Sequence, residues 1–195
     1  REVVALSREE AQIRAAATGL RPYDSLLDLY EPGMNSARLD TLFGDLKSWL
    51  PNLIQQVTER QQHETLLQPQ GPFPTAKQAE LGKQVMQLLG FDFQRGRQDV
   101  SVHPFCGGVP SDVRITTRYD ESDFTQSLMG IIHETGHARY EQGLPAEWLQ
   151  LPVGQARSMG IHESQSLFFE MQLARHPAFM ARLSPLVNAT FGEQS

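Results

Sequence analysis

Two histidines and a glutamate share one five-residue segment near the middle of the sequence, His133-Glu134-Thr135-Gly136-His137. Residues four positions apart lie on the same face of an α-helix, so both imidazoles could bind one metal ion. The Glu134 carboxylate would then lie beside that ion and could accept a proton from an attacking water molecule. This spacing is typical of zinc hydrolases, and it predicts metal-assisted hydrolysis of peptide bonds with Glu134 as a catalytic residue.

The surrounding residues predict the helix that this chemistry requires. Ser122 or Asp123 can cap its first turn, and Gly143 ends it. Apolar residues recur at helical spacing between these limits, whereas the two histidines fall on a more polar stripe. Gly130 and Gly136 would allow another backbone to approach the helix closely. A solvated polar face that carries the same residues by chance is the alternative at this point.

A catalytic zinc site needs a third protein ligand and leaves a fourth position for water or substrate. Glu163 is the predicted third ligand because it falls early in a second predicted helix, from about residue 156 to residue 176. The proline-containing segment 144–154 could turn the chain back between the two helices. Glu147 competes for the role, but it lies in that connecting segment, where its side chain would be held less firmly.

Two further residues of the second helix are predicted to lie outside the set of ligands. His162 is adjacent to Glu163, but its side chain points about a quarter-turn away on a helix, so we do not expect it to bind the metal. Glu170 lies two turns beyond Glu163 and is expected either to support a ligand or to lie on the surface.

Four blocks of residues in chain order resemble the central part of the carboxypeptidase Taq family of metallocarboxypeptidases. They are His103-Pro104-Phe105, Asp112-Val113-Arg114-Ile115-Thr116, His133-Glu134-Thr135-Gly136-His137 and His162-Glu163-Ser164-Gln165. Similar stretches at Tyr30-Glu31-Pro32-Gly33-Met34 and Gly90-Phe91-Asp92-Phe93 extend the resemblance over nearly the whole chain. The resemblance therefore does not depend on one short motif.

The resemblance implies an activity and a set of site residues. His133, His137 and Glu163 would bind one divalent metal ion, Zn²⁺ in the first place and Co²⁺ as an alternative, with Glu134 as the general base. The reaction would remove single residues from the C-termini of peptide substrates. His103 is the second predicted catalytic residue, because its block recurs in the family and a histidine beside a cleft can donate to a developing oxyanion.

Asp112 and Arg114 share one face of a predicted strand. A charged pair of this kind more often stabilises the fold than binds substrate, because partly buried charges need partners. Both interpretations stay open for these two residues.

Members of this family are considerably longer than 195 residues, and both ends of the chain are expected to lie within a longer protein. The residues with which the family holds the C-terminal carboxylate of its substrate belong to a later block. The segment alone is therefore expected to turn over substrate weakly or not at all. The resemblance also implies that the longer protein is a homodimer.

Composition limits the other possibilities. A length of 195 residues with 39% hydrophobic residues is enough for a single domain over residues 1–195. The net charge of -6, without a run of basic residues, argues against nucleic acid as a partner. No stretch of about 18 apolar residues is present that could span a membrane. The lone Cys106 excludes an internal disulfide and fits a reducing, cytoplasmic location.

The predicted fold class is mainly α, a helical zincin-like domain with a short β-hairpin bordering the metal cleft. Earlier helices are predicted over residues 1–29, 35–63 and 75–90. A break is expected between Gly19 and Pro22, and a kink or a split at Pro51. The apolar period changes to two between residues 99 and 119, which predicts a hairpin with residues 106–110 as its connection.

Two other functions stay open at this stage. One is a helical protein-interaction domain in which the His-Glu pattern is fortuitous. The other is a metalloendopeptidase that uses the same three ligands. Metal content separates the first from an enzyme, and hydrolysis of peptides with free or amidated C-termini separates the second from a carboxypeptidase.

Overall fold

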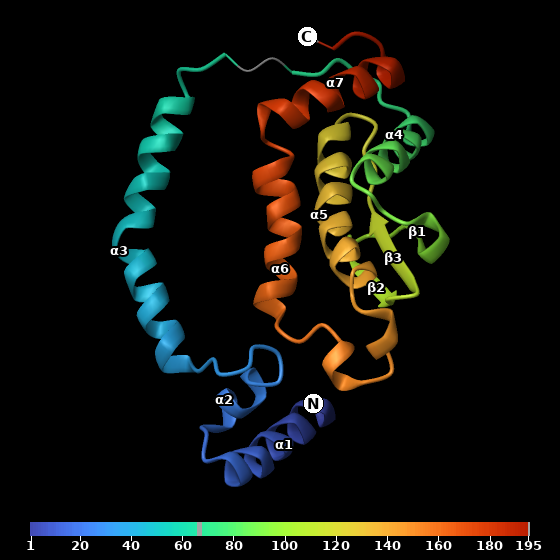
Figure 1. The fold of residues 1–195 in the computed structure, drawn as a ribbon. Helices are drawn as coiled ribbons and strands as arrows, with labels where there is room; N and C mark the ends of the chain where they lie inside the picture. The colour runs from blue at the N-terminus through green and yellow to red at the C-terminus, as the bar shows by residue number, and fades with distance from the viewer. Residues whose placement is uncertain (66–67, 195) are drawn as a thin grey trace. The chain divides into compact units, whose positions relative to one another are not determined.

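The computed structural model describes residues 1–65 and 68–194 (Figure 1). These residues form two compact units. The first comprises residues 1–65 and 157–159, and the second comprises residues 68–156 and 160–194. That residues 1–195 make up a single domain stays a prediction. No helix within the described ranges has both the length and the apolar character needed to cross a membrane.

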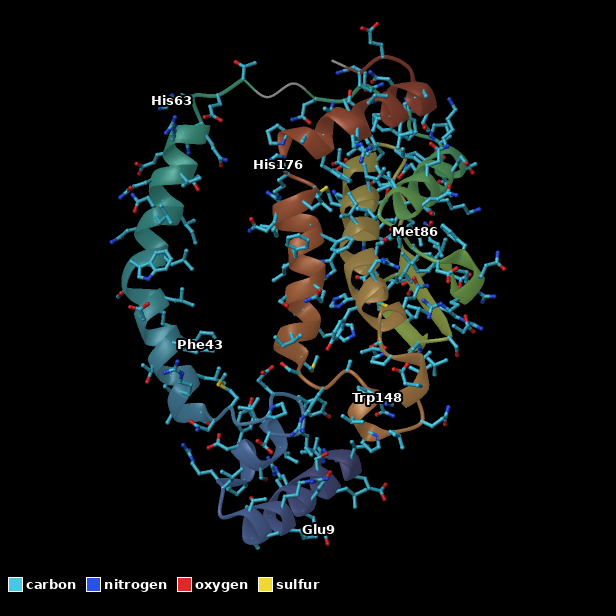
Figure 2. All side chains as sticks on the ribbon, viewed as in Figure 1. Glu9, Phe43, His63, Met86, Trp148 and His176 are labelled. Carbon is cyan, nitrogen blue, oxygen red and sulfur yellow. The ribbon has the colours of Figure 1, made fainter. Side chains whose placement is uncertain are left out.

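The first unit is helical. Its elements are α1 (Glu2–Thr18), α2 (Pro22–Leu27) and α3 (Ser36–Gln61). Gly19 ends α1 with a φ of 75°, a left-handed conformation that glycine adopts without steric cost, and Pro22 opens α2. The predicted break between Gly19 and Pro22 is therefore confirmed. Phe43, labelled on α3 in Figure 2, is 53% exposed.

The start of α3 follows from its cap. The Asn35 side chain accepts a hydrogen bond from the Arg38 backbone N–H at 2.9 Å, which satisfies one of the free donors of the first turn. The helix then runs unbroken through Pro51. Of the two outcomes predicted for this proline, a kink or a split, the split is wrong.

The second unit contains the HExxH segment. Its elements are α4 (Thr75–Leu88), η1 (Phe93–Arg95), β1 (Gly96–Val100), β2 (Cys106–Val109), β3 (Asp112–Thr117), α5 (Phe124–Gln142), η2 (Ala146–Trp148), η3 (Pro152–Gly154), α6 (Met159–Leu167, from Gly160 on), η4 (Phe168–Leu173) and α7 (Pro177–Phe191). Helix α5 is central, because it packs against α4, β2, β3 and η4. Figure 1 shows it between α6 and the strands.

The three strands form one mixed sheet in the order β1-β3-β2. Strand β1 pairs with β3 in parallel, and β2 pairs with β3 antiparallel. The predicted hairpin exists, but its first strand is β2, which occupies the segment predicted as the connection. Gly108 explains the error: its φ is 101° and an added Cβ would lie 2.2 Å from the Asp112 carbonyl oxygen, so this glycine serves close strand pairing.

The buried face of α5 fixes how the helix is rotated. Its predicted apolar stripe is buried, at Phe124, Leu128, Ile131, Ile132 and Thr135. Ile131 packs in one core cluster with Met86, which Figure 2 labels, and with Val113 and Ile115 of β3. Ile132 packs in a second cluster with residues of α4 and α7. The fold class, mainly α with a short hairpin, is confirmed, whereas α7 was not predicted.

The second predicted helix starts later than predicted, and its second part is a π-helix. Its α-helical part is α6, which starts at Met159 rather than near residue 156. It continues as the π-helix η4, in which the Ala174 N–H donates to the Phe169 carbonyl at 2.8 Å, a bond that spans five residues. A π-helical turn is uncommon and occurs frequently at functional sites.

Candidate metal centre

Helices α5 and α6 bring the three predicted ligands together. His133 Nε2 lies 3.6 Å from Glu163 Oε1, and His137 Nε2 lies 3.3 Å from Glu163 Oε2. One donor atom from each of the three residues lies within 4.8 Å of the others. In a tetrahedral zinc site with bonds of about 2.0–2.2 Å, neighbouring donor atoms are about 3.4 Å apart. The spacing of these donors therefore fits one metal ion.

The position of Glu163 depends on a close approach of the two helices at Gly136. A Cβ added to Gly136 would lie 2.6 Å from Ser166 Cα and 2.7 Å from the Gln165 carbonyl oxygen. Only glycine leaves room for the α6 backbone at this point. The same expectation for Gly130 is wrong, because an added Cβ there would meet no atom of the described residues within 4 Å.

This difference gives a matched pair of variants. Gly136→Ala is expected to lower the free energy of unfolding by about 1–3 kcal/mol, because the new methyl group must push α6 away from α5. Displacement of Glu163 should also weaken metal binding about 10-fold or more, the range seen when ligands lose their support. Gly130→Ala, in the same helix, should be neutral or stabilising by up to about 1 kcal/mol.

Urea unfolding and a metal titration of both variants check this expectation. Equal losses of stability in the two variants would show that the contact at Gly136 does not hold the helices at their observed separation.

Glu134 lies on the same helix, turned toward the interior. Its side chain is buried, with 7% of the residue exposed. Burial raises the pKa of its carboxyl above the ordinary value; the neighbouring His133 opposes this rise, and the Glu163 carboxylate adds to it. A carboxylate with a raised pKa accepts a proton more readily, which suits a general base.

His137 is held in the state that binds metals. Burial, followed by the nearby His162 and His133, lowers the pKa of its imidazole. A lowered pKa favours the neutral ring, and only the neutral ring has a free nitrogen lone pair for a metal ion.

The outward nitrogens of both histidines also have partners. His133 Nδ1 lies 2.9 Å from Glu170 Oε2, so Glu170 contacts a predicted ligand, as the first of its two expected roles requires. His137 Nδ1 lies 2.6 Å from His162 Nδ1, and His162 Nε2 lies 2.8 Å from Glu141 Oε1. His162 is thus outside the group of possible ligands, as expected, but its contact with His137 was missed.

Part of this arrangement has a signal in the sequence, namely the position of Glu141 relative to His137. Glu141 follows His137 by four residues, so the two side chains share one face of α5. The contact through His162 could not be inferred, because it depends on how α6 crosses α5.

Within the described ranges, the group that could hold a metal ion consists of His133, His137 and Glu163, and the other predicted site residues lie outside it. Glu147, the competing ligand, is exposed in η2. His103 has an exposed side chain between β1 and β2, and its carbonyl accepts a hydrogen bond from the Thr116 hydroxyl at 3.4 Å. Its catalytic role stays a prediction.

Asp112 and Arg114 form an ion pair with one another at 2.6 Å, with both side chains about half exposed. The hydrogen bond from Arg114 lowers the pKa of the Asp112 carboxyl. Each charge has a partner within strand β3, but both side chains are too exposed to need one, so the structural and the substrate-binding interpretations both stay open.

The sequence and the fold were compared with known proteins. Residues 1–195 match the family model described as carboxypeptidase Taq (M32) metallopeptidase. Carboxypeptidase 1 of Bacillus subtilis (strain 168) is 46% identical over 159 residues, which cover 81% of this chain and 32% of that protein. Thermostable carboxypeptidase 1 of Thermus thermophilus is 39% identical over 199 residues, which cover 98% of this chain and 39% of that protein.

Among solved structures, Trypanosoma cruzi metallocarboxypeptidase 1 superimposes with a TM-score of 0.91 and 52% sequence identity, over 99% of this chain and 39% of that chain. The chain thus spans between 32% and 39% of the length of these relatives. Because the family match extends from the first residue to the last, the HExxH segment is not a chance pattern in an unrelated helical domain. The chain belongs to the carboxypeptidase Taq (M32) family of metallopeptidases.

Proposed function

We propose that this chain is the metal-binding core of a zinc-dependent carboxypeptidase that removes single amino acids from the C-termini of peptides. The observation that carries the proposal is the convergence of His133, His137 and Glu163, with both Nε2 atoms facing one carboxylate at 3.3–3.6 Å. Membership of a metallopeptidase family supports it. Co²⁺ is the alternative metal, because two imidazoles and one carboxylate also suit that ion.

Each residue has a distinct part in the proposed reaction. His133, His137 and Glu163 would hold the ion and leave a fourth position for water or the substrate carbonyl. A bound divalent ion lowers the pKa of water and polarises a carbonyl group. Glu134 would take the proton of the attacking water and pass it to the leaving amine. His103 is proposed as a donor to the oxyanion, a role that its exposed imidazole would have to fill when substrate is present.

The substrates, the assembly and the location belong to the proposal as well. Peptides with a free C-terminus would be the substrates, neither nucleic acid nor membrane would be a partner, and the longer protein would be a cytoplasmic homodimer. The names of the relatives as carboxypeptidases support the first of these statements. A net charge of -6 supports the exclusion of nucleic acid.

The form of the substrate's C-terminus provides the test. A protein of full family length that contains this chain should release the last residue of an N-blocked dipeptide. It should act at least about 100-fold more slowly on the amidated analogue, because the recognised carboxylate is absent. Liquid chromatography of the released amino acids checks this. Equal cleavage of both peptides, or cleavage at internal bonds, would support the alternative of a metalloendopeptidase.

The 195-residue chain alone should bind one equivalent of metal and show weak turnover or none. Elemental analysis after dialysis against Zn²⁺ measures the first, and the dipeptide assay, with Bacillus subtilis carboxypeptidase 1 as the positive control, measures the second. A chain that takes up no metal under these conditions contradicts the proposed function.

A further inference from the structure

The Nδ1 atoms of the two proposed histidine ligands contact different kinds of group. His133 contacts a carboxylate directly, at Glu170, whereas His137 contacts a second imidazole, at His162, which in turn contacts Glu141. We propose that His162 and Glu141 form a relay that fixes the tautomer of His137, so that its Nε2 atom is unprotonated and available to the metal. The inference deepens the proposed function, since it rests on His137 being a ligand.

The contact between His133 and Glu170 shows how a carboxylate determines which imidazole nitrogen carries the proton. An ionised carboxylate accepts hydrogen bonds but cannot donate them, and a neutral imidazole carries a single N–H. The 2.9 Å contact between His133 Nδ1 and Glu170 Oε2 therefore places the proton of His133 on Nδ1. Its Nε2 atom is then bare, and this is the atom that lies 3.6 Å from Glu163.

The same count of donors and acceptors applies to the series of contacts from Glu141 through His162 to His137. Glu141 accepts at 2.8 Å from His162 Nε2, so the single proton of a neutral His162 is on Nε2. His162 Nδ1 is then an acceptor, and His137 Nδ1 must donate to it across 2.6 Å. The Nε2 atom of His137 is unprotonated as a result: its distance to Glu163 is 3.3 Å, against 2.6 Å for the contact at Nδ1, so the shorter contact holds the proton. Both ligands thus present the same nitrogen.

The surroundings hold the relay in place. The side chains of His137, His162 and Glu141 are only 15–23% exposed, so water competes weakly for their hydrogen bonds. The Tyr140 ring meets the His162 ring edge-on, with 5.0 Å between centroids and an interplanar angle of 88°. His162 is therefore positioned by an aromatic contact as well as by its two hydrogen bonds.

The relay predicts that a substitution at Glu141 changes the tautomer of His137, although His162 lies between them. In Glu141→Lys, the new ammonium group can only donate, so a contact with His162 Nε2 would move the His162 proton to Nδ1. His137 Nδ1 would then have to accept, and the His137 proton would move to Nε2, where it blocks the metal. His133 should be unaffected, because its partner is Glu170. Glu141 and His162 are positioning residues in this scheme, since neither touches the ion or the substrate.

The tautomers can be observed in the metal-free chain. Two-bond ¹H–¹⁵N correlation spectra of ¹⁵N-histidine protein would be recorded at about pH 8.5, well above the ordinary histidine pKa of about 6.5. We expect N–H on Nδ1 of His133 and His137 and on Nε2 of His162 in the wild type. In Glu141→Lys, we expect a shift of the protons of His137 and His162 to their other nitrogens, and no change at His133.

Metal affinity is the second measurement, by competition with a chelator for Zn²⁺. Glu141→Lys should bind at least about 10–100-fold more weakly than the wild type, the usual cost of losing a partner behind a ligand. Glu147→Lys is the matched control, because it makes the same change of charge at an exposed residue outside the site, and it should change neither readout. Glu141→Asp keeps the acceptor and should keep the wild-type tautomers.

The outcomes separate the relay from the proposed function. If the wild type binds zinc but the His137 tautomer and the affinity are the same in Glu141→Lys and Glu147→Lys, the relay is overturned and the metal site stands. A swap of tautomers in both Glu141 variants, or in neither, also overturns it. If the wild type binds no zinc, the proposed function fails, while the tautomers of His137 and His162 still decide whether the relay exists.

Discussion

Replacing Glu163 with alanine is expected to weaken metal binding by more than about 100-fold, beyond the 10–100-fold cost of losing a partner behind a ligand. Glu163 supplies the carboxylate that faces both Nε2 atoms, and its removal leaves two imidazoles on one helix. The side chain is 49% exposed, so folding should change by no more than about 0.5 kcal/mol. Elemental analysis and calorimetric titration with Zn²⁺ measure the first effect, and urea unfolding of the metal-free chain measures the second.

Glu147→Ala is the control for this variant, because Glu147 is the other acidic residue considered as a third ligand. It should keep one equivalent of metal. Added Zn²⁺ should raise the unfolding temperature of the wild type and of Glu147→Ala, since a ligand that binds only the folded state stabilises it, and it should leave Glu163→Ala unchanged. Loss of metal from Glu147→Ala with retention in Glu163→Ala would reverse the assignment.

Replacing Glu134 with glutamine should separate metal binding from catalysis. Glu134 is not among the three possible ligands, so the variant should keep one equivalent of Zn²⁺. Glutamine has nearly the same shape but cannot accept a proton at neutral pH, so turnover should fall by about 10²–10⁴-fold, the usual contribution of a general base. The measurement is kcat on an N-blocked dipeptide, in a protein of full family length that contains this chain, beside its metal content.

Glu134→Asp is a useful companion to the glutamine variant, because it keeps the carboxylate but withdraws it by one methylene. Partial activity in the aspartate variant with none in the glutamine variant supports proton transfer at this position. A glutamine variant with wild-type turnover would remove Glu134 from the reaction. Loss of metal along with activity would instead place Glu134 among the ligands.

The central helix of the site was predictable because several local signals agree. Asp123 caps α5, the apolar stripe from Phe124 to Thr135 is buried, and the more polar stripe carries His133 and His137. Burial of one face fixes the rotation of a helix, so the direction of the two imidazoles follows from the sequence. Glu163 was found by a similar argument, from a turn followed by a second helical pattern.

The contacts behind the ligands could not be predicted in the same way. A helical projection shows which way His162 points relative to Glu163 and predicts that His162 is not a ligand, which agrees with its place outside the group that could hold an ion in the described residues. It does not show what His162 points toward, which depends on the crossing of α5 and α6 at Gly136. Sequence spacing describes one helix at a time, whereas a contact between helices depends on both.

The β-sheet shows a different limit. Glycines at positions 107 and 108 are typical of turns, and for that reason the segment was assigned to a connection. In the structure Gly108 belongs to a strand, because only a residue without Cβ permits the observed approach to Asp112. Glycine occurs both in turns and in closely paired strands, and only the position of the neighbouring strand distinguishes the two cases.

The π-helical turn of η4 makes the length of this segment as important as its composition. A π-helix accommodates one residue more per turn than an α-helix needs. Deleting Phe168 or Phe169 would return the chain to regular winding and rotate the carboxylate of Glu170 by about 100° away from His133. His162 and Glu163 precede the deletion and would stay where they are. Lineages that retain the contact between His133 and Glu170 should therefore keep the number of residues in this segment unchanged.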